Sequence, residues 1–202
     1  MPATGRVEIE APACGVRSRG YRSGMQAPSS LASRRIELSR VRECDASDIF
    51  DGYAQDAEVT RYLSWTPRTD ISQVDDFIAD RLLRWENGES FAWVIRLNDS
   101  RDLIGMIEAR VDSHRLELGY AIAHRFWGMG FATEAVRAVV EWSAHEPAVK
   151  CVWGYADVDN VASSRVLEKA GLSQAGLLEG WATHPNIAPT PRDCYIYSIR
   201  LA

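Results

Sequence analysis

The segment Trp127-Gly128-Met129-Gly130-Phe131-Ala132-Thr133-Glu134-Ala135 places two glycines directly before a strongly amphipathic stretch. Phe131, Ala135 and Val139 recur every four residues, which predicts a helix with one buried apolar face. The first N–H groups of a helix have no partner within it, and they lie at the positive end of its dipole. Because glycines leave such groups uncovered, we expect this glycine turn (residues 127–133) to suit a phosphate or pyrophosphate.

Two spacings of the pattern Arg/Gln-x-x-Gly-x-Gly/Ala overlap in the glycine turn, and neither is specific alone. One begins at Arg125, and the other has Trp127 in the first place. The glycines are equally compatible with close packing of a helix on a strand. A nucleotide-binding P-loop needs Gly-Lys-Ser/Thr, which is absent, and the dinucleotide fingerprint needs a glycine where Thr133 stands.

The length and composition of the chain are those of one domain with a short extension. The 202 residues are 46% hydrophobic, so residues 34–202 are expected to bury a full core as one domain. Residues 1–33 are rich in Gly, Ala, Ser, Pro and Arg without apolar periodicity. We therefore expect a disordered or flexible extension there.

Charge and cysteine content argue against several classes of partner. The net charge of −5 makes nucleic acid an unsuitable partner, because such sites need clustered Lys and Arg. No apolar run approaches the roughly 18 residues of a membrane span, so no membrane is expected. The cysteines are far apart and have no nearby histidine pairing, so we expect reduced thiols in a cytoplasmic protein and no metal site.

Apolar patterns predict strands and helices from residue 35 onward. The expected elements, in order, are a strand over 35–41, a helix capped by Asp45, a helix over 70–87, strands over 91–97, 103–111 and 115–122, the helix of the glycine turn, a strand over 150–156, a helix between Asn160 and Gly171, and strands over 175–181 and 194–201. The three strands before the glycine turn are expected to form an antiparallel meander. The strand–helix–strand passage that follows implies two parallel neighbours joined by a right-handed crossover.

This order of elements is similar to that of the GNAT acetyltransferases, and the sequence details resemble the RimJ/RimL-type branch. Four stretches carry the resemblance: EVTRYLSWTP over 58–67, ELGYAIAHRFWGMGFATEA over 117–135, DNVASSRVLEKAGL over 159–172, and Arg192-Asp193 followed by 195–199. Together they span residues 34–202. The resemblance implies the GNAT fold, an α+β domain with a mixed, mostly antiparallel sheet of six to seven strands, helices on both faces and a splayed central pair of parallel strands.

The resemblance implies acetyl-CoA as cosubstrate, with its pantetheine arm lying between the splayed strands, here 116–122 and 150–156. The implied cofactor-binding residues are Tyr120, Ala121 and Ile122 for the arm, Trp127, Gly128, Met129, Gly130, Phe131, Ala132 and Thr133 for the pyrophosphate, and Asn160 and Ser163 near the thioester. In this branch a serine at the position of Ser163 is suited to contact the cofactor sulfur. Asn160 fits a helix N-cap at least as well, and Ser163 also fits an ordinary first-turn helix residue.

Glu117 and Ser163 are the candidate catalytic residues. Glu117 lies on the strand that borders the cofactor gap, where a partly desolvated carboxylate could accept the proton of an ammonium group. A solvated strand position is the alternative for Glu117. Some relatives carry a Glu and a Tyr where this chain has Tyr155 and Leu167, so that base-and-acid pair is missing.

Other titratable or aromatic residues are weaker candidates. Glu108 is a second candidate base, whereas Glu134 fits better as an anion that stabilises the helix start. His184 is the histidine expected to face a substrate. Four aromatic residues lie in regions that line the acceptor side in this family, although each also fits a core position: Tyr62, Trp65, Trp85 and Trp181.

The leading hypothesis is an N-acetyltransferase that moves an acetyl group from acetyl-CoA to a primary amine by direct attack in a ternary complex. The acceptor is either a protein N-terminus or a small molecule, and the sequence does not choose between them. A non-catalytic CoA-binding sensor or assembly module with the same fold is the alternative, motivated by the missing pair. The oligomeric state is left open, with a homodimer among the expectations.

Overall fold

The computed structural model describes residues 24–201 of the chain. The strands in this range are β1 (Ser30–Ala32), β2 (Ile36–Arg40), β3 (Ser90–Leu97), β4 (Leu103–Asp112), β5 (Arg115–Ile122), β6 (Cys151–Asp157), β7 (Ser173–Ala182) and β8 (Arg192–Arg200). The α-helices are α1 (Ala46–Ile49), α2 (Ala57–Thr60), α3 (Ser72–Glu86), α4 (Phe131–Ala144) and α5 (Val161–Lys169), with short 3-10 or π turns η1 (Glu43–Asp45), η2 (Phe50–Ala54) and η3 (His124–Phe126).

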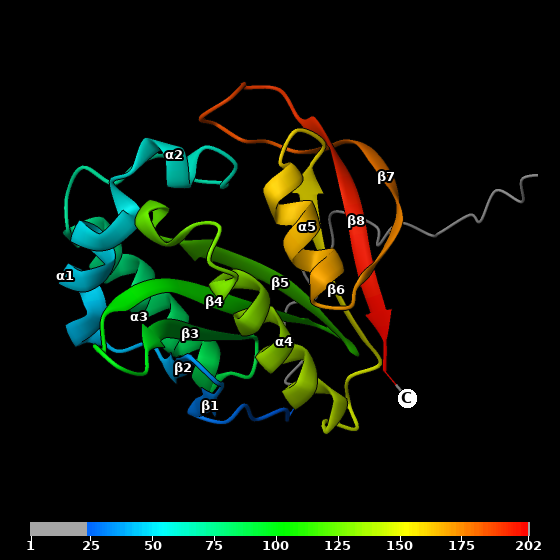
Figure 1. The fold of residues 1–202 in the computed structure, drawn as a ribbon, viewed down its shortest axis with the longest axis horizontal. Helices are drawn as coiled ribbons and strands as arrows, with labels where there is room; N and C mark the ends of the chain where they lie inside the picture. The colour runs from blue at the N-terminus through cyan, green and yellow to red at the C-terminus, as the bar shows by residue number, and fades with distance from the viewer. Residues whose placement is uncertain (1–23, 202) are drawn as a thin grey trace, which may run out of the picture.

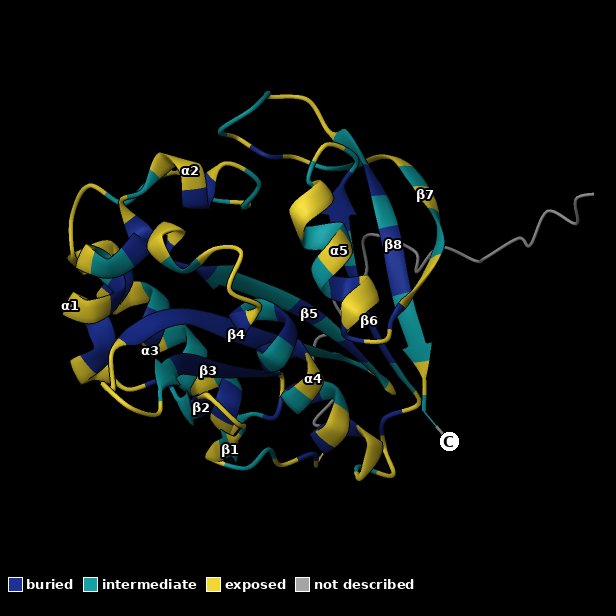
Figure 2. Cartoon of the chain, in the orientation of Figure 1, coloured by how far each residue is buried: buried dark blue, intermediate teal, exposed yellow. Residues whose placement is uncertain are grey.

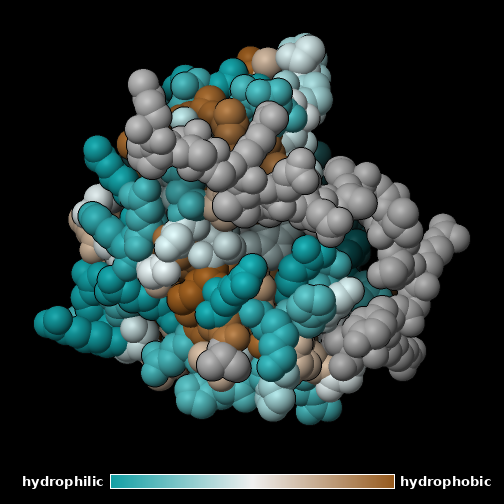
Figure 3. Space-filling view, turned by 90° about the vertical axis from the view of Figure 1, so that its right-hand side faces the viewer, coloured by the Kyte–Doolittle hydropathy of each residue, from teal (hydrophilic) through white to brown (hydrophobic). Residues whose placement is uncertain are grey.

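The strands of residues 24–201 form one sheet in the order β1-β2-β3-β4-β5-β6-β8-β7. The neighbouring strands are antiparallel except β5 and β6, which are joined through α4 as the sequence predicts. Strand β7 forms one edge of the sheet. On this side of the molecule the described residues are mainly hydrophilic, with small hydrophobic areas between them (Figure 3).

The parallel strands β5 and β6 separate along their length (Figure 1). They pair only at Arg115 with Cys151, Leu116 with Val152, and Glu117 with Trp153. Beyond these pairs, β5 continues to Ile122 and β6 to Asp157 without pairing with each other. The expected splayed central pair is therefore confirmed, and we call the space that opens between the two strands the gap.

Helices cover both faces of the sheet (Figure 1). One core lies under α4 and α5, and its members include Leu116, Val136 and Leu167. A second core lies under α1, η2 and α3, where Ile78 packs near Val94. Figure 2 shows the buried residues concentrated on the central strands and on the inner sides of the helices. The amphipathic pattern of α4 is thus satisfied, because one side of this helix faces the sheet.

The sheet has eight strands in residues 24–201, one more than the six to seven expected. The additional strand, β1, lies inside the extension predicted over residues 1–33, of which residues 1–23 are outside the described range. It pairs with β2, and nearby the carbonyl of Pro28 accepts the indole N–H of Trp93 at 3.0 Å. A three-residue edge strand shows no apolar alternation, so its formation depends on tertiary pairing that the sequence pattern does not reveal.

The helix expected after Asp45 begins as α1 and continues as the π turn η2 to Ala54, ahead of the separate helix α2. Asp45 is buried and makes no capping bond to the helix, because its carboxylate accepts from Arg42 and Arg96. A new start occurs at Asp56, whose side chain accepts the N–H of Glu58 at 2.8 Å. The apolar spacing of this segment correctly predicts a buried face, to which Ile49 and Tyr53 belong, but not the π turn.

Candidate functional site

The glycine turn leaves the first N–H groups of α4 open. Gly128 and Gly130 have φ angles of 76° and 82°, in the left-handed region that glycine adopts easily. The first backbone bond of the helix runs from the N–H of Glu134 to the carbonyl of Gly130 at 3.1 Å. No acceptor within residues 24–201 pairs with the N–H groups of residues 128–133. These groups form the kind of concave donor set that binds an anion.

Space around the two glycines is also open. A Cβ added at Gly128 would meet nothing within 4 Å, and one at Gly130 would meet only Nη2 of Arg35, at 3.5 Å. The glycines are therefore not explained by tight packing of helix against strand, which was the alternative interpretation of the turn. Their positive φ angles and the uncovered N–H groups fit a ligand better.

Arg35, in the turn between β1 and β2, fixes the geometry of the glycine turn. Its Nη1 donates to the carbonyl of Met129 at 3.0 Å, and its guanidinium lies 4.5 Å from the ring centre of Phe131. Its Nε and backbone N–H both donate to Glu134, at 2.7 Å each. Burial alone would raise the pKa of Glu134, but these bonds and one from Ser33 lower it below its ordinary value. Glu134 thus acts as an anchor for Arg35.

Trp127 closes the turn onto the end of β5. Its indole N–H donates to the carbonyl of Ile122 at 2.7 Å, and its ring lies 4.5 Å from that of His124. The side chain remains 45% exposed. One acceptor position of the Ile122 carbonyl, which the resemblance assigns to the cofactor arm, is therefore already occupied by the indole.

Tyr120 reaches across from β5 to α5. Its hydroxyl lies 2.8 Å from Oγ of Ser163 and 3.2 Å from the Ser163 carbonyl, although the two residues are far apart in sequence. Burial raises the pKa of Tyr120 well above its ordinary value, so the phenol stays protonated. Ala121 and Ile122 follow on the part of β5 that pairs with β4 but not with β6. The structure thus brings Tyr120 and Ser163 together, a contact that the sequence did not predict.

Asn160 is the N-cap of α5, which is one of the two roles expected for it. Its Oδ1 accepts the N–H of Ser163 at 3.1 Å, while its Nδ2 has no hydrogen-bond partner within the described residues. The amide N–H₂ of Asn160 is therefore available to a ligand, and the cap fixes its orientation.

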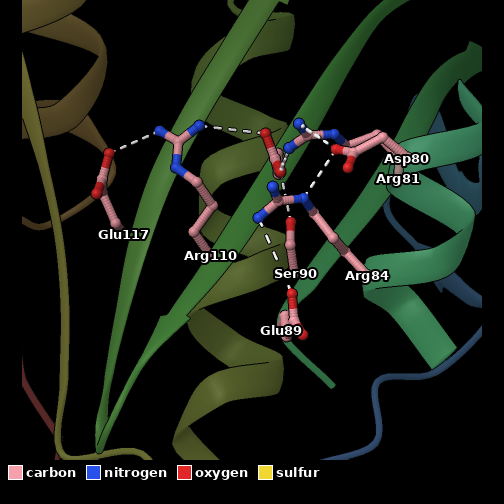
Figure 4. Close-up of polar contacts among 8 residues, drawn as sticks. Asp80, Arg81, Arg84, Glu89, Ser90, Arg110 and Glu117 are labelled. Carbon is pink, nitrogen blue, oxygen red and sulfur yellow. Dashed lines mark hydrogen bonds and ion pairs between the residues drawn. The ribbon is translucent and has the colours of Figure 1, made fainter. Parts of the chain in front are cut away.

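Glu117 lies at the point where β5 and β6 part, on the sheet face opposite α4 and α5 (Figure 4). Its Oε1 accepts from Nη2 of Arg110 at 2.6 Å, and its Oε2 has no partner in residues 24–201. Tyr155 on β6 lies near Glu117, two residues beyond Trp153, which is the last residue of β6 that pairs with β5. Burial raises the pKa of Tyr155, and the Glu117 carboxylate raises it further, whereas Arg110 opposes the shift.

Glu108 is positioned differently from Glu117. It is 8% exposed, and its Oε1 accepts from both Arg81 and Ser90, while its Oε2 is 3.2 Å from Arg110. Both oxygens are therefore occupied, which makes Glu108 a poor proton acceptor.

Two loops approach each other at the open end of the gap. Asn186, in the β7–β8 loop, donates to the carbonyls of Thr60 and Trp65 at 2.6 and 2.8 Å. His184 is buried beside Tyr62 and lies 3.5 Å from Asp157. Burial lowers the pKa of His184, although Asp157 opposes the shift, so the ring is neutral near pH 7.

Arg192 completes the polar contacts of this region. Its Nε and Nη2 form a bidentate pair with Asp157 at 2.6 and 3.0 Å, and Nη2 also reaches Asp159. Among the aromatic candidates, Trp181 contacts Tyr155, whereas Trp85 packs with Phe91 and Trp93 in the core.

Two residues at this site, Arg35 and Arg110, were absent from the sequence-based candidates. Arg110 was detectable in principle, because a two-residue turn at Ser113 and His114 places it directly opposite Glu117. Arg35 carries no such local signal, since its partner Glu134 is 99 positions away.

Two further features are absent from residues 24–201. No helix in this range is long and apolar enough to cross a bilayer. Among the same residues, no three His, Cys, Asp or Glu side chains are grouped so that they could hold a metal ion.

Comparison with known proteins identifies the family. Residues 35–173 match the family model of the acetyltransferase (GNAT) domain. The chain is 31% identical over 172 residues to the uncharacterized N-acetyltransferase YoaA of Bacillus subtilis (strain 168). This alignment covers 84% of the present chain and 95% of YoaA.

Solved structures share the fold. Mycobacterium smegmatis RimJ in complex with CoA-disulfide superposes with a TM-score of 0.77 at 18% identity, over 87% of this chain and 90% of that one. The microcin C7 self-immunity acetyltransferase MccE, in complex with acetyl-CoA and AMP, superposes with a TM-score of 0.77 at 19% identity. The superposition covers 87% of this chain and 98% of that one. The family model and the identity to YoaA establish that the chain belongs to the GNAT acetyltransferase family, and the open glycine turn and the parted strands β5 and β6 agree with this.

Proposed function

We propose that this protein transfers the acetyl group of acetyl-CoA to a primary amine, by direct attack in a ternary complex. The observation that carries the proposal is the combination of the parted strands with the unpartnered N–H groups of residues 128–133. The two structural relatives described above hold CoA-disulfide and acetyl-CoA, which supports the same cosubstrate here.

The residues present fit a CoA molecule. The glycine turn offers unpartnered donors for a diphosphate, and the space above Gly128 and Gly130 would be reduced by any side chain. The β6-facing edge of β5 near Tyr120, Ala121 and Ile122 would pair with the amides of the pantetheine arm, as an added strand does.

Acetyl-CoA supplies the activated acetyl thioester, and the chain would supply proton transfer and orientation. Glu117 would take the proton of the acceptor ammonium through Oε2, directly or by way of water. The hydroxyl of Ser163, oriented by Tyr120, would hold a proton beside the thioester sulfur of acetyl-CoA. The Nδ2 group of Asn160 would donate a hydrogen bond to the cofactor or to the substrate.

The acceptor would enter from the side of Glu117, beneath the loops that Asn186 ties together. Both a protein N-terminus and a small-molecule amine carry the primary amine that this reaction needs. The deciding experiment measures acetyl-CoA binding by titration calorimetry and thiol release with a broad panel of amines and peptides.

Binding together with thiol release for at least one amine supports the proposal. Binding without thiol release across the whole panel favours the non-catalytic CoA-binding module. Absence of binding at millimolar acetyl-CoA contradicts both functions.

A further inference from the structure

Arg110 lies between two carboxylates on the sheet face that carries Glu117 (Figure 4). Its Nη2 is 2.6 Å from Oε1 of Glu117 on β5, and its Nη1 is 3.2 Å from Oε2 of Glu108 on β4. Burial alone would lower the pKa of Arg110, but the two carboxylates raise it above its ordinary value. The guanidinium is therefore a fixed cation with two fixed partners.

Gly119 provides the room for this guanidinium. Gly119 is paired with Glu108 across the β4–β5 ladder, and Arg110 is paired with Glu117. A Cβ added at Gly119 would lie 3.0 Å from Nη2 and 3.4 Å from Nη1 of Arg110. The absence of a side chain at this one position lets Arg110 lie flat over the strand and reach Glu117.

Glu108 in turn is anchored outside the hairpin. Its Oε1 accepts from Arg81 on α3 and from the hydroxyl of Ser90 on β3. Arg81 also pairs with Asp80 at 2.8 Å. A continuous line of polar contacts therefore runs from α3 through Glu108 and Arg110 to Glu117. Such a line of contacts limits the movement of each member.

We propose that Arg110, resting on Gly119 and anchored through Glu108, is the positioning residue of the Glu117 carboxylate. It fixes Oε1 and leaves Oε2 for the acceptor amine. The inference deepens the proposed function, since it rests on Glu117 as the proton acceptor. The charged or titratable groups that face Glu117 from the neighbouring strands are Arg110 on β4 and Tyr155 on β6.

The test compares Arg110→Gln, Arg110→Lys and Gly119→Ala, with Arg115→Gln as the matched control. Arg115 lies two residues before Glu117 on β5 and forms a similar ion pair, with Asp112 at 2.6 Å instead of with Glu117. Acetyl-CoA affinity is expected to be unchanged in every variant. In Arg110→Gln, kcat/KM for the amine is expected to fall about tenfold or more. The loss is expected in kcat rather than in KM, because a displaced Glu117 carboxylate impairs proton removal and not binding of the amine.

Arg110→Lys retains the charge and a donor toward Glu117, so part of the rate is expected to be restored. Gly119→Ala is expected to lower kcat less than Arg110→Gln does, because its Cβ displaces the guanidinium by a few tenths of an ångström and changes no charge. An unchanged kcat in folded Arg110→Gln, or the same loss of kcat in Arg115→Gln, overturns the inference.

A wild-type protein that binds acetyl-CoA but acetylates no amine contradicts the proposed function instead. In that case crystal structures of Arg110→Gln and Gly119→Ala decide the inference. Displacement of the Glu117 carboxylate in both variants supports it, and a carboxylate that keeps its place overturns it.

Discussion

Nε of Arg35 lies 2.7 Å from Oε2 of Glu134, although 99 positions separate the two residues. The same guanidinium holds the carbonyl of Met129. Because a trans peptide is planar, with its N–H opposite its C=O, holding this carbonyl turns the N–H of Gly130 to the other side. The ion pair between Arg35 and Glu134 therefore orients one donor of the glycine turn.

Removing this orientation should weaken phosphate binding. In Arg35→Ala we expect acetyl-CoA affinity to fall about tenfold, the scale of one charge-assisted hydrogen bond. Acetyl-pantetheine, which has no diphosphate, should bind as it does to the wild type. Glu134→Gln should have a similar effect, and the double variant should lose less than the sum, because the two residues act as one unit. Calorimetry of the four proteins checks this, and strict additivity would contradict it.

A side chain at the helix entrance should block the cofactor. In Gly130→Val we expect a large loss of CoA affinity in a folded protein, because the valine covers N–H groups and is strained at a φ of 82°. Gly180→Val is the matched control, since Gly180 has a φ of 55° and open space but lies in β7. Equal CoA affinity in the two variants would show that the turn is not the phosphate site.

The carboxylate of Glu117 should set the pH dependence of the reaction. In Glu117→Gln we expect kcat to fall by about 10²-fold or more, the usual range for loss of a positioned base. The acid limb of the pH profile should disappear with it. A rate–pH profile identical to that of the wild type would assign the proton to water or to another residue.

The contact between Tyr120 and Ser163 should affect turnover rather than cofactor binding. Ser163→Ala should lower kcat about tenfold or more, because it removes the proton donor proposed for the leaving sulfur. Tyr120→Phe keeps the ring and should give a smaller loss through misorientation of Ser163. Pre-steady-state thiol release, measured beside acetyl-CoA affinity, separates the two effects. Unchanged release in Ser163→Ala would remove that role.

Acid should destabilise the fold through Asp157 and Glu134. Burial would raise the pKa of Asp157, but bonds from Arg192 and the Asp159 backbone lower it below its ordinary value. A carboxyl group whose pKa is lower in the folded state stabilises the fold at pH values above its pKa in the unfolded state, which is about 3.9 for Asp. This contribution is lost as the pH falls through the pKa of the folded state. Urea unfolding should therefore show stability falling below about pH 4.

The matching variant is Asp157→Asn, which should be less stable than the wild type at pH 7 and lose less stability on acidification. Parallel stability curves for the two proteins between pH 7 and pH 2 would contradict this account.

Local patterns predicted the elements well where residues alternate or recur regularly. The period of Phe131, Ala135 and Val139 correctly predicted α4, and the alternation around Leu116 and Leu118 correctly predicted β5. The splay of β5 and β6 followed from the family resemblance and not from any local pattern. β1 was missed because three residues at a sheet edge carry no period.

The site was predicted only in part for a related reason. Glycines and caps are local signals, so the open turn and the Asn160 cap were accessible from the sequence. The partners of Glu117 and Glu134 are set by strand pairing and helix docking, which join distant residues. The roles assigned to Glu117, Ser163 and the cofactor-binding residues stay predictions until the experiments above are done.

The double hydrogen bond of Asn186 has a consequence for engineering. Its amide joins the β7–β8 loop to the carbonyls of Thr60 and Trp65, so neither loop can change shape independently of the other. A chimera designed to accept a new amine should therefore exchange both loops as a single cassette. Swapping the β7–β8 loop alone would leave the carbonyls of Thr60 and Trp65 without their donor.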